Sequence, residues 1–207
     1  MRLFEFDNTY IFEDVQKTIA VYPGRFHPFH KGHKAVYDHL SKKYDEVFIA
    51  TSDKQEEGSP FSFEEKKKMM LLTGIPENNI SLEREPYRPL NIQSNFDENT
   101  TALVMGLGQK DMEGENVRFK PGVKKNGEPS YFQYNTDNKE PFSKHAYLEV
   151  VPTVTFDVLG QKAKSATEMR KMYSSLNDDQ AQQFIQDLFG NYDSEVQQIL
   201  DTKLNRR

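Results

Sequence analysis

The segment KTIAVYPGRFHPFHKGH, residues 17–33, decides the fold because a strand pattern changes into a helix pattern inside it. Residues 17–23 form a short, mainly apolar run ended by a Pro-Gly pair, which predicts a buried strand. From residue 32 to residue 44 the apolar side chains recur at helical spacing, which predicts a helix. The turn between strand and helix holds three of the chain's five histidines, His27, His30 and His33.

Strands and helices alternate through most of the chain. Four further segments have the apolar content of strands, namely 45–52, 79–84, 100–106 and 148–156. A capping box between Ser62 and Glu65 predicts a helix start, and the run Lys66-Lys67-Lys68 in that helix is typical of a solvated face. This alternation favours an α/β fold with a Rossmann-like parallel sheet and helices on both faces. Ligands of such sheets bind beyond the carboxyl ends of the strands, and the histidine turn directly follows such an end.

Two parts of the sequence depart from this alternation. Residues 111–147 are an insertion in which an Asn-Gly dipeptide predicts a hairpin, so we expect a β-ribbon or loop. Its aromatic residues either clamp a base or pack the insertion against the domain, and we favour packing; they are Phe119, Tyr131, Phe132 and Tyr134. Two amphipathic segments, capped by Asn177 and by Ser194, predict a C-terminal helical hairpin, with an oligomer contact as the alternative. We therefore expect a domain of residues 1–175 and a helical extension of residues 176–207.

Composition limits the function classes. The chain has 207 residues, no cysteine and a net charge of −5. Disulfides, thiolate zinc sites and cysteine nucleophiles are excluded, and the acidic charge disfavours nucleic acid and anionic membranes as partners. The N-terminal residues do not resemble a secretory signal, and the longest apolar run, ALVMGL, is far shorter than the roughly 20 residues of a membrane span. We expect a cytoplasmic protein that binds neither nucleic acid nor membrane.

Three explanations are open for the histidine turn. A protein-bound metal is disfavoured because no cysteine and no nearby carboxylate completes a tetrahedral set. A solvated surface loop explains one histidine more easily than three within ten residues. A phosphate-binding turn fits best, since Gly24 permits close backbone approach and the helix that follows presents free N–H groups to an anion. A bound triphosphate would raise the pKa of the imidazoles and favour their donor form.

Two motifs then give the chain a family resemblance. The unit GRFHPFHKGH, residues 24–33, resembles the His-x-Gly-His signature of the nucleotidylyltransferase superfamily, most closely the archaeal-type nicotinamide-mononucleotide adenylyltransferases. The chain departs from the archaeal pattern G-R-F-Q-P-F-H-x-G-H at His27, which replaces a glutamine. Residues 165–170, Ser-Ala-Thr-Glu-Met-Arg, resemble the superfamily's later S-[TSA]-T-x-x-R motif and form a second capping box. The resemblance spans residues 17–175 and makes the expected α/β domain a nucleotidyltransferase domain.

The resemblance implies direct in-line transfer of a nucleotidyl group from ATP or another NTP to a small phosphorylated acceptor. Such chemistry depends on positioning and charge stabilisation, which the resemblance assigns to His30, His33 and Arg170 as catalytic residues. Nucleotide and phosphate binding is expected from Gly24, Arg25, Phe26, Gly32, Ser165 and Thr167. Acceptor or base contacts are expected from His27 and from Gly106, Lys110 and Asp111, in the segment Gly-Leu-Gly-Gln-Lys-Asp, which resembles a glycine–lysine–aspartate turn of some adenylyltransferases. Mg²⁺ is the expected cofactor, bound mainly through substrate phosphates.

The motifs do not by themselves fix the acceptor. The archaeal-type pattern favours adenylyl transfer to nicotinamide mononucleotide, giving NAD. A cytidylyltransferase that makes a CDP-linked precursor is the alternative, because the motifs bind triphosphate without naming the base. A nucleotide-binding or structural module without turnover is a third hypothesis, against which the intact motif residues argue. Members of the superfamily are often oligomers, so the resemblance also implies a homo-oligomer.

Overall fold

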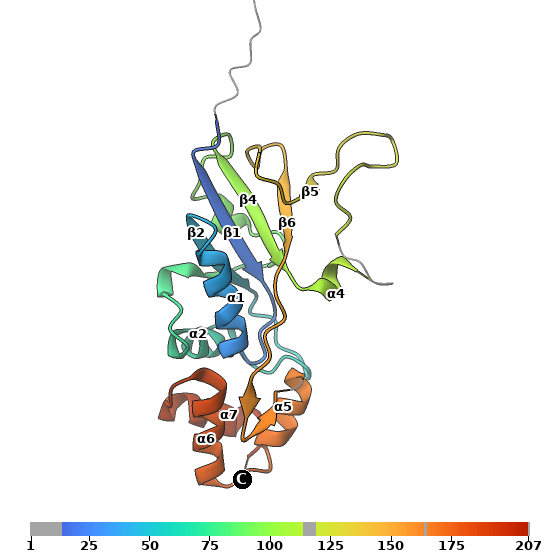
Figure 1. Ribbon diagram of the computed structural model, residues 1–207. Coiled ribbons are helices and arrows are strands. Elements are labelled where there is room, and N and C mark those ends of the chain that lie inside the picture. The colour runs from blue at the N-terminus through green and yellow to red at the C-terminus, as the bar shows by residue number, and fades with distance from the viewer. Residues whose placement is uncertain (1–13, 114–118, 164, 207) are drawn as a thin grey trace, which may run out of the picture.

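Six strands form one parallel sheet in the computed structural model (Figure 1). The structure describes residues 14–113, 119–163 and 165–206. The sheet order is β3-β2-β1-β4-β6-β5, and every neighbouring pair is parallel. The strands are β1 (Lys17–Pro23), β2 (Glu46–Thr51), β3 (Ile80–Leu82), β4 (Thr101–Leu107), β5 (Phe132–Tyr134) and β6 (Ala146–Val150). The strand order reverses between β1 and β4, which predicts a ligand crevice at their carboxyl ends.

Both faces of the sheet are covered, which confirms the Rossmann-like fold expected from the sequence. Helices α1 (Lys31–Ser41) and α2 (Phe63–Leu72) pack with the C-terminal helices on one apolar core. The short α3 (Leu90–Gln93) and part of the insertion contribute to a second core on the other face. The remaining elements are the 3₁₀ turn η1 (Glu77–Asn79), α4 (Gln109–Met112), the antiparallel pair β7 (Asp157–Val158) and β8 (Gln161–Lys162), α5 (Ala166–Tyr173), α6 (Asp178–Phe189) and α7 (Ser194–Lys203).

The strand expected at residues 148–156 is shorter and begins earlier. β6 ends at Val150, and the last bond to its neighbour is donated by Val151 N–H to the carbonyl of Leu107, where β4 also ends. Residues 152–155 therefore lie beyond the end of β4 and do not pair with the sheet. They run as an extended connection from the sheet to β7 (Figure 1).

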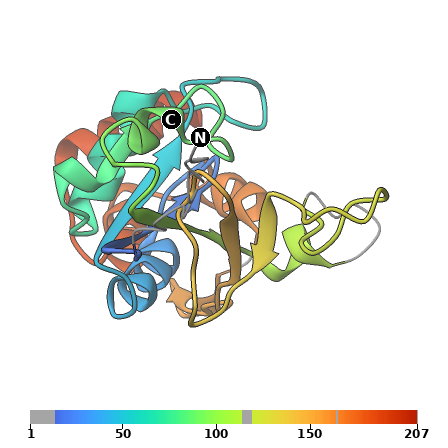
Figure 2. The ribbon, with the colours of Figure 1, turned by 90° about the horizontal axis from the view of Figure 1, so that it is seen from above.

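The insertion contains the expected turn, but β5, which falls within the expected ribbon, pairs with the main sheet and not across that turn. Val123 and Pro129 form an isolated bridge around the Asn-Gly turn, which projects from the side of the sheet (Figure 2). Farther along, β5 joins the sheet edge beside β6. The packing interpretation of the aromatics is confirmed for Phe119 and Phe132, whose ring centroids lie 5.0 Å apart against the second core. Tyr131 packs on Phe132, whereas Tyr134 is exposed.

The C-terminal extension forms the expected pair of helices, which lie below α2 and beside α5 (Figure 1). Asn177 caps α6 through a capping box with Gln180. The expected cap of α7 at Ser194 is wrong, because the preceding Asp193 occupies that position. Its carboxylate accepts from two backbone N–H groups, and an anion at a helix N-terminus also interacts favourably with the dipole.

Candidate active site

The turn between β1 and α1 is shaped by one buried aromatic ring. Gly24 donates its N–H to the carbonyl of Ala50 at the end of β2, over 3.0 Å. A Cβ on Gly24 would lie 2.6 Å from the ring of Phe26, so a larger residue does not fit there. Phe26 has a φ of 51°, in the left-handed region, and its buried ring contacts those of Tyr22 and His33. The chain thereby reverses just beyond the sheet and enters α1.

His30 caps the N-terminus of α1, and this role orients its imidazole. Its Nδ1 accepts from the N–H of His33 over 3.4 Å. Burial lowers the pKa of His30 to about 4, opposed by a smaller effect of a backbone hydrogen bond, so the ring is neutral at pH 7. A neutral imidazole whose Nδ1 accepts carries its proton on Nε2. His30 therefore offers an Nε2–H donor without a positive charge.

His33 and Gly32 are packed tightly around that ring. The rings of His30 and His33 stack with centroids 3.7 Å apart. A Cβ on Gly32 would lie 2.8 Å from Cε1 of Phe156 and 3.0 Å from Nδ1 of His30. Glycine at position 32 thus leaves the space in which the His30 ring sits.

The second motif, residues 165–170, contacts this turn through Arg170 and His27, which are 143 positions apart in the sequence. Ser165 caps α5 through a capping box with Glu168, as the sequence predicts. Arg170 on α5 donates from Nη1 to the carbonyl of His27 over 2.6 Å, and its Nη2 donates to Oγ1 of Thr167 over 3.3 Å. The N-termini of α1 and α5 therefore open onto one common space.

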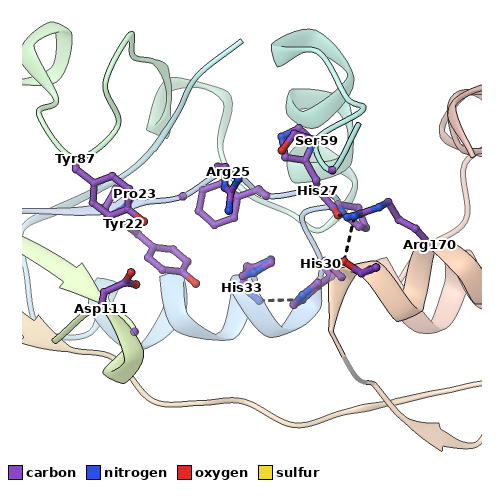
Figure 3. Close-up of a pocket in the computed structure, with 17 residues that line it drawn as sticks. Tyr22, Pro23, Arg25, His27, His30, His33, Ser59, Tyr87, Asp111 and Arg170 are labelled. Atoms are coloured by element: carbon purple, nitrogen blue, oxygen red, sulfur yellow. Dashed lines mark hydrogen bonds between the residues drawn. The ribbon is translucent and has the colours of Figure 1, made fainter. Parts of the chain in front are cut away.

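That space is a cavity of about 510 Å³ at the carboxyl ends of β1 and β4 (Figure 3). Different side chains line its two ends. The histidines and Arg170 lie at one end, and Tyr22, Tyr87 and Asp111 lie at the other. The lining residues are Tyr22, Pro23, Gly24, Arg25, Phe26, His27, Pro28, His30, His33, Gly58, Ser59, Tyr87, Gly108, Asp111, Ala166, Thr167 and Arg170.

The structure brings most of the expected site residues to this cavity. Arg25 lines it and forms an exposed ion pair with Glu56 over 3.4 Å. Ser165 is not among the lining residues and acts as the helix cap. Gly106 lies inside β4 instead, where a Cβ would come within 3.0 Å of Leu40 and Val151, so its position serves packing and not a base contact. The side chain of Lys110 lies outside the part of the chain that the structure describes.

His27 faces the β2–α2 connection with one of its ring nitrogens. Its Nδ1 accepts from the N–H of Phe61 over 3.3 Å, and the two rings stack. Burial, followed by the charges of Lys66 and Arg170, lowers the pKa of His27 to about 3. His27 is therefore neutral at pH 7 and helps to hold the turn against the domain.

Sequence reasoning missed the tyrosine end of the cavity and one buried cation. Tyr22 and Tyr87 are 65 positions apart in sequence, and only the tertiary fold brings them together. Burial raises the pKa of Tyr22, and Tyr87 and Asp111 add to the rise. The interpretation of Lys66 as a solvated residue is wrong, since its side chain is fully buried. Its helical spacing to the buried Met69 and Met70 was the sequence signal for this burial.

The cavity provides few ligands for a metal of its own. Among the residues that the structure describes, no group of three histidine, aspartate or glutamate side chains is arranged to hold a metal ion. Asp111 is the one carboxylate among the cavity's lining residues. This donor set suits a divalent cation held mainly by phosphate oxygens and water. In the described part of the chain, no helix has the length and apolarity to cross a membrane.

The fold and this paired-motif site define a nucleotidyltransferase-type domain. The family model described as cytidylyltransferase-like matches residues 21–175. The chain therefore belongs to the cytidylyltransferase-like family.

Individual relatives match over shorter stretches. The chain is 38% identical over 74 residues to a nicotinamide-nucleotide adenylyltransferase of Sulfurisphaera tokodaii, covering 34% of this chain and 42% of the relative. It is 31% identical over 91 residues to a phosphopantetheine adenylyltransferase of Desulforudis audaxviator, covering 43% of this chain and 53% of the relative. The chain thus spans about half the length of these curated relatives.

Solved structures share the fold at low identity. The chain is similar to a bifunctional NMN adenylyltransferase/ADP ribose pyrophosphatase of Francisella tularensis, with a TM-score of 0.51 and 20% identity. The match covers 91% of this chain and 51% of that one. At this identity the likeness establishes the fold alone.

Proposed function

We propose that the protein transfers the adenylyl group of ATP to nicotinamide mononucleotide, giving NAD and pyrophosphate. One observation carries the proposal: Arg170 of the second motif is bonded to the His27 carbonyl of the first, so both phosphate-binding motifs face one cavity. Family membership and the named adenylyltransferase relatives support it.

The proposed reaction is a single displacement at phosphorus. A phosphate oxygen of the acceptor attacks the α-phosphorus of ATP, and the bond from that phosphorus to the oxygen bridging to the β-phosphorus breaks. Pyrophosphate leaves with that oxygen. Negative charge moves towards the leaving group, so the protein's contribution is to fix donors and cations around it. No covalent bond to the enzyme is required.

We assign three groups to this role. Nε2–H of the neutral His30 and the N-terminus of α1 donate to the phosphates from one side. Arg170 and the N-terminus of α5 act from the other side, with Thr167 beside them. His33, whose ring stacks on that of His30, is the third group that we assign to the phosphates. When bound, Mg²⁺ neutralises phosphate charge in this arrangement.

The acceptor is assigned to the opposite end of the cavity. Tyr22 and Tyr87 provide aromatic surface there, and Asp111 provides a carboxylate. An aromatic wall beside an acidic group suits a cationic ring such as nicotinamide, which stacks on aromatic faces. Phosphopantetheine is the second candidate, because several relatives are named phosphopantetheine adenylyltransferases. It has no ring to stack on this wall.

Pyrophosphate release with Mg²⁺ tests the proposal. ATP and CTP are each combined with nicotinamide mononucleotide or with phosphopantetheine, and NAD is identified among the products by mass. We expect release with ATP and nicotinamide mononucleotide, lost in Arg170→Ala and kept in Lys42→Ala, an exposed lysine after α1. Release only with phosphopantetheine or only with CTP would reassign the substrate. Nucleotide binding without release in any combination would contradict the transferase function.

A further inference from the structure

The buried lysine of α2 differs from its two neighbours in the Lys-Lys-Lys run. Lys67 and Lys68 form surface ion pairs, with Glu77 over 2.7 Å and with Glu195 over 2.5 Å. Lys66 has no exposed surface. No carboxylate lies within ion-pair distance of its ammonium among the residues that the structure describes, although Asp53 is near enough to act on it through space.

The ammonium of Lys66 instead donates to three oxygens behind the histidine turn. It donates to Oγ1 of Thr51 over 2.9 Å and to the carbonyl of Ser52, both at the end of β2. It also donates to the carbonyl of Arg25 over 3.4 Å, inside the turn itself. The lysine therefore joins the carboxyl end of β2 to the segment that lines the cavity.

This arrangement is costly for the free protein. A buried ammonium without a carboxylate is disfavoured relative to an apolar side chain of the same shape. Burial accordingly lowers the pKa of Lys66 to about 8, with Asp53 opposing the shift. Stability of the fold alone does not explain a lysine at this position, whereas an anion bound close by would offset the cost.

We propose that Lys66 is a positioning residue for the triphosphate: its ammonium fixes the Arg25 carbonyl and places a positive charge behind the phosphate-binding turn. The proposal rests on the proposed function and extends it to a residue outside both motifs. In a trans peptide the C=O and N–H point in opposite directions, so holding the Arg25 carbonyl turns the N–H of Phe26 away from Lys66, towards the ligand.

A second contact of the same kind supports this role. Arg170 holds the carbonyl of His27, two residues after the carbonyl that Lys66 holds. Phe26, between them, has the left-handed backbone conformation that the turn requires. Two cations thus fix the carbonyls on either side of the strained residue, one from α2 and one from α5.

The test compares three variants by calorimetric binding of a non-hydrolysable ATP analogue with Mg²⁺ and by thermal unfolding. We expect Lys66→Met to bind the analogue at least about tenfold more weakly without a lower melting temperature, because the variant removes a buried charge. Lys66→Arg keeps the charge and should retain most of the affinity. Lys68→Met, the matched substitution at an exposed position of the same helix, should bind like the wild type.

The pH dependence of binding separates this role from a structural one. Wild-type affinity should fall as the pH rises through about 8, where Lys66 loses its proton, and Lys66→Arg should bind with no such fall. Asp53 and His27 are the titratable groups that interact with Lys66 through space. Burial, followed by the charge of Lys66, lowers the pKa of His27 to about 3, so His27 stays neutral throughout this range.

Each outcome decides between the two proposals. Wild-type affinity of Lys66→Met for the analogue would overturn the role of Lys66. Equal losses of affinity in Lys66→Met and Lys66→Arg would also overturn it. Binding that depends on Lys66 but no transfer to any acceptor would overturn only the proposed reaction. A wild-type protein that binds no ATP analogue would overturn both.

Discussion

Replacement of Gly32 by alanine is expected to separate activity from stability. The new Cβ would lie 2.8 Å from Cε1 of Phe156 and 3.0 Å from Nδ1 of His30, both closer than normal contacts. One of these rings must shift. Since His30 is packed between His33 and Phe156, we expect its Nε2–H donor to move out of line with the phosphates.

The two energetic effects on folding oppose each other. Alanine in place of glycine inside α1 stabilises the helix by about 0.5–1 kcal/mol. Overpacking the two rings costs about 1–3 kcal/mol. The net cost is therefore at most about 2.5 kcal/mol, which should lower the melting temperature by no more than about 10 °C for a chain of this size. Displacement of one preorganised donor, in contrast, should lower kcat/KM by about 10- to 100-fold.

The assay is pyrophosphate release beside a thermal melt of each variant. Ser41→Ala, at the other end of α1, controls for a gain in helix propensity and should retain wild-type activity. Gly32→Ala with unchanged kcat/KM would refute the reasoning, because the Phe156 ring alone would then have yielded. A fall in activity with a large drop in melting temperature would also refute it, since the fold and not the donor would have failed.

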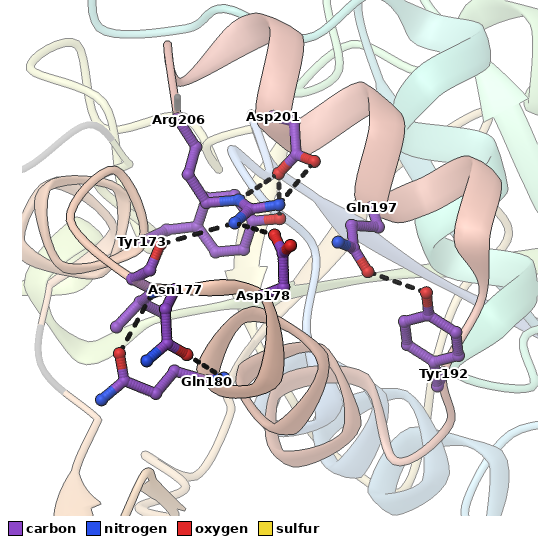
Figure 4. Close-up of polar contacts among 9 residues, drawn as sticks. Tyr173, Asn177, Asp178, Gln180, Tyr192, Gln197, Asp201 and Arg206 are labelled. Atoms are coloured by element: carbon purple, nitrogen blue, oxygen red, sulfur yellow. Dashed lines mark hydrogen bonds and ion pairs between the residues drawn. The ribbon is translucent and has the colours of Figure 1, made fainter.

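Three further changes have expected outcomes. Arg170→Lys should lower kcat/KM by about 10²-fold or more in the pyrophosphate assay, because lysine cannot bond the His27 carbonyl and Thr167 as a planar fork does; wild-type activity would contradict the assignment. Arg206→Ala should destabilise the protein by about 2 kcal/mol in chemical unfolding, since it removes charged hydrogen bonds to Asp201 that are shielded from water (Figure 4). The control Tyr192→Phe removes an exposed hydrogen bond to Gln197 and should change the stability little. Burial lowers the pKa of His27 to about 3 in the folded protein, so below pH 6.5 the unfolded chain binds a proton that the folded protein does not. Stability should therefore fall as the pH drops from about 6.5 towards 3, by up to about 1.4 kcal/mol per pH unit. His27→Gln should show a shallower fall, and an unchanged slope would refute this.

The sequence contained local signals strong enough for much of the fold. The strand–turn–helix unit, the capping boxes at Ser62 and Ser165 and the cap at Asn177 depend on neighbouring residues only, and the structure has all of them. β5 could not be predicted in this way. It has three residues, and its place at the sheet edge depends on pairing with β6.

The same difference between local signals and tertiary packing applies to the residues of the candidate site. His30 and Arg170 were identifiable because each lies in a motif at a helix start. Tyr87 lies in a loop without a pattern, and it reaches the cavity only because β3 and β4 are neighbours of β2 and β1. For Lys66 the signal was present but outweighed by composition: a triple lysine predicts a solvated face, while spacing to Met69 and Met70 predicts burial.

The position of Arg170 depends on residues beyond the matched family region, which ends at residue 175. Arg170 lies on α5, a helix of eight residues that needs tertiary support. One turn later on the same helix, the hydroxyl of Tyr173 donates to Asp201 of α7 over 2.6 Å, and its ring packs on Phe184 of α6 (Figure 4). The C-terminal helices thus support α5 from the side opposite its proposed phosphate-binding face. The second motif contributes Arg170 to the proposed reaction, and the C-terminal helices help to fix the position of Arg170 relative to the histidine turn.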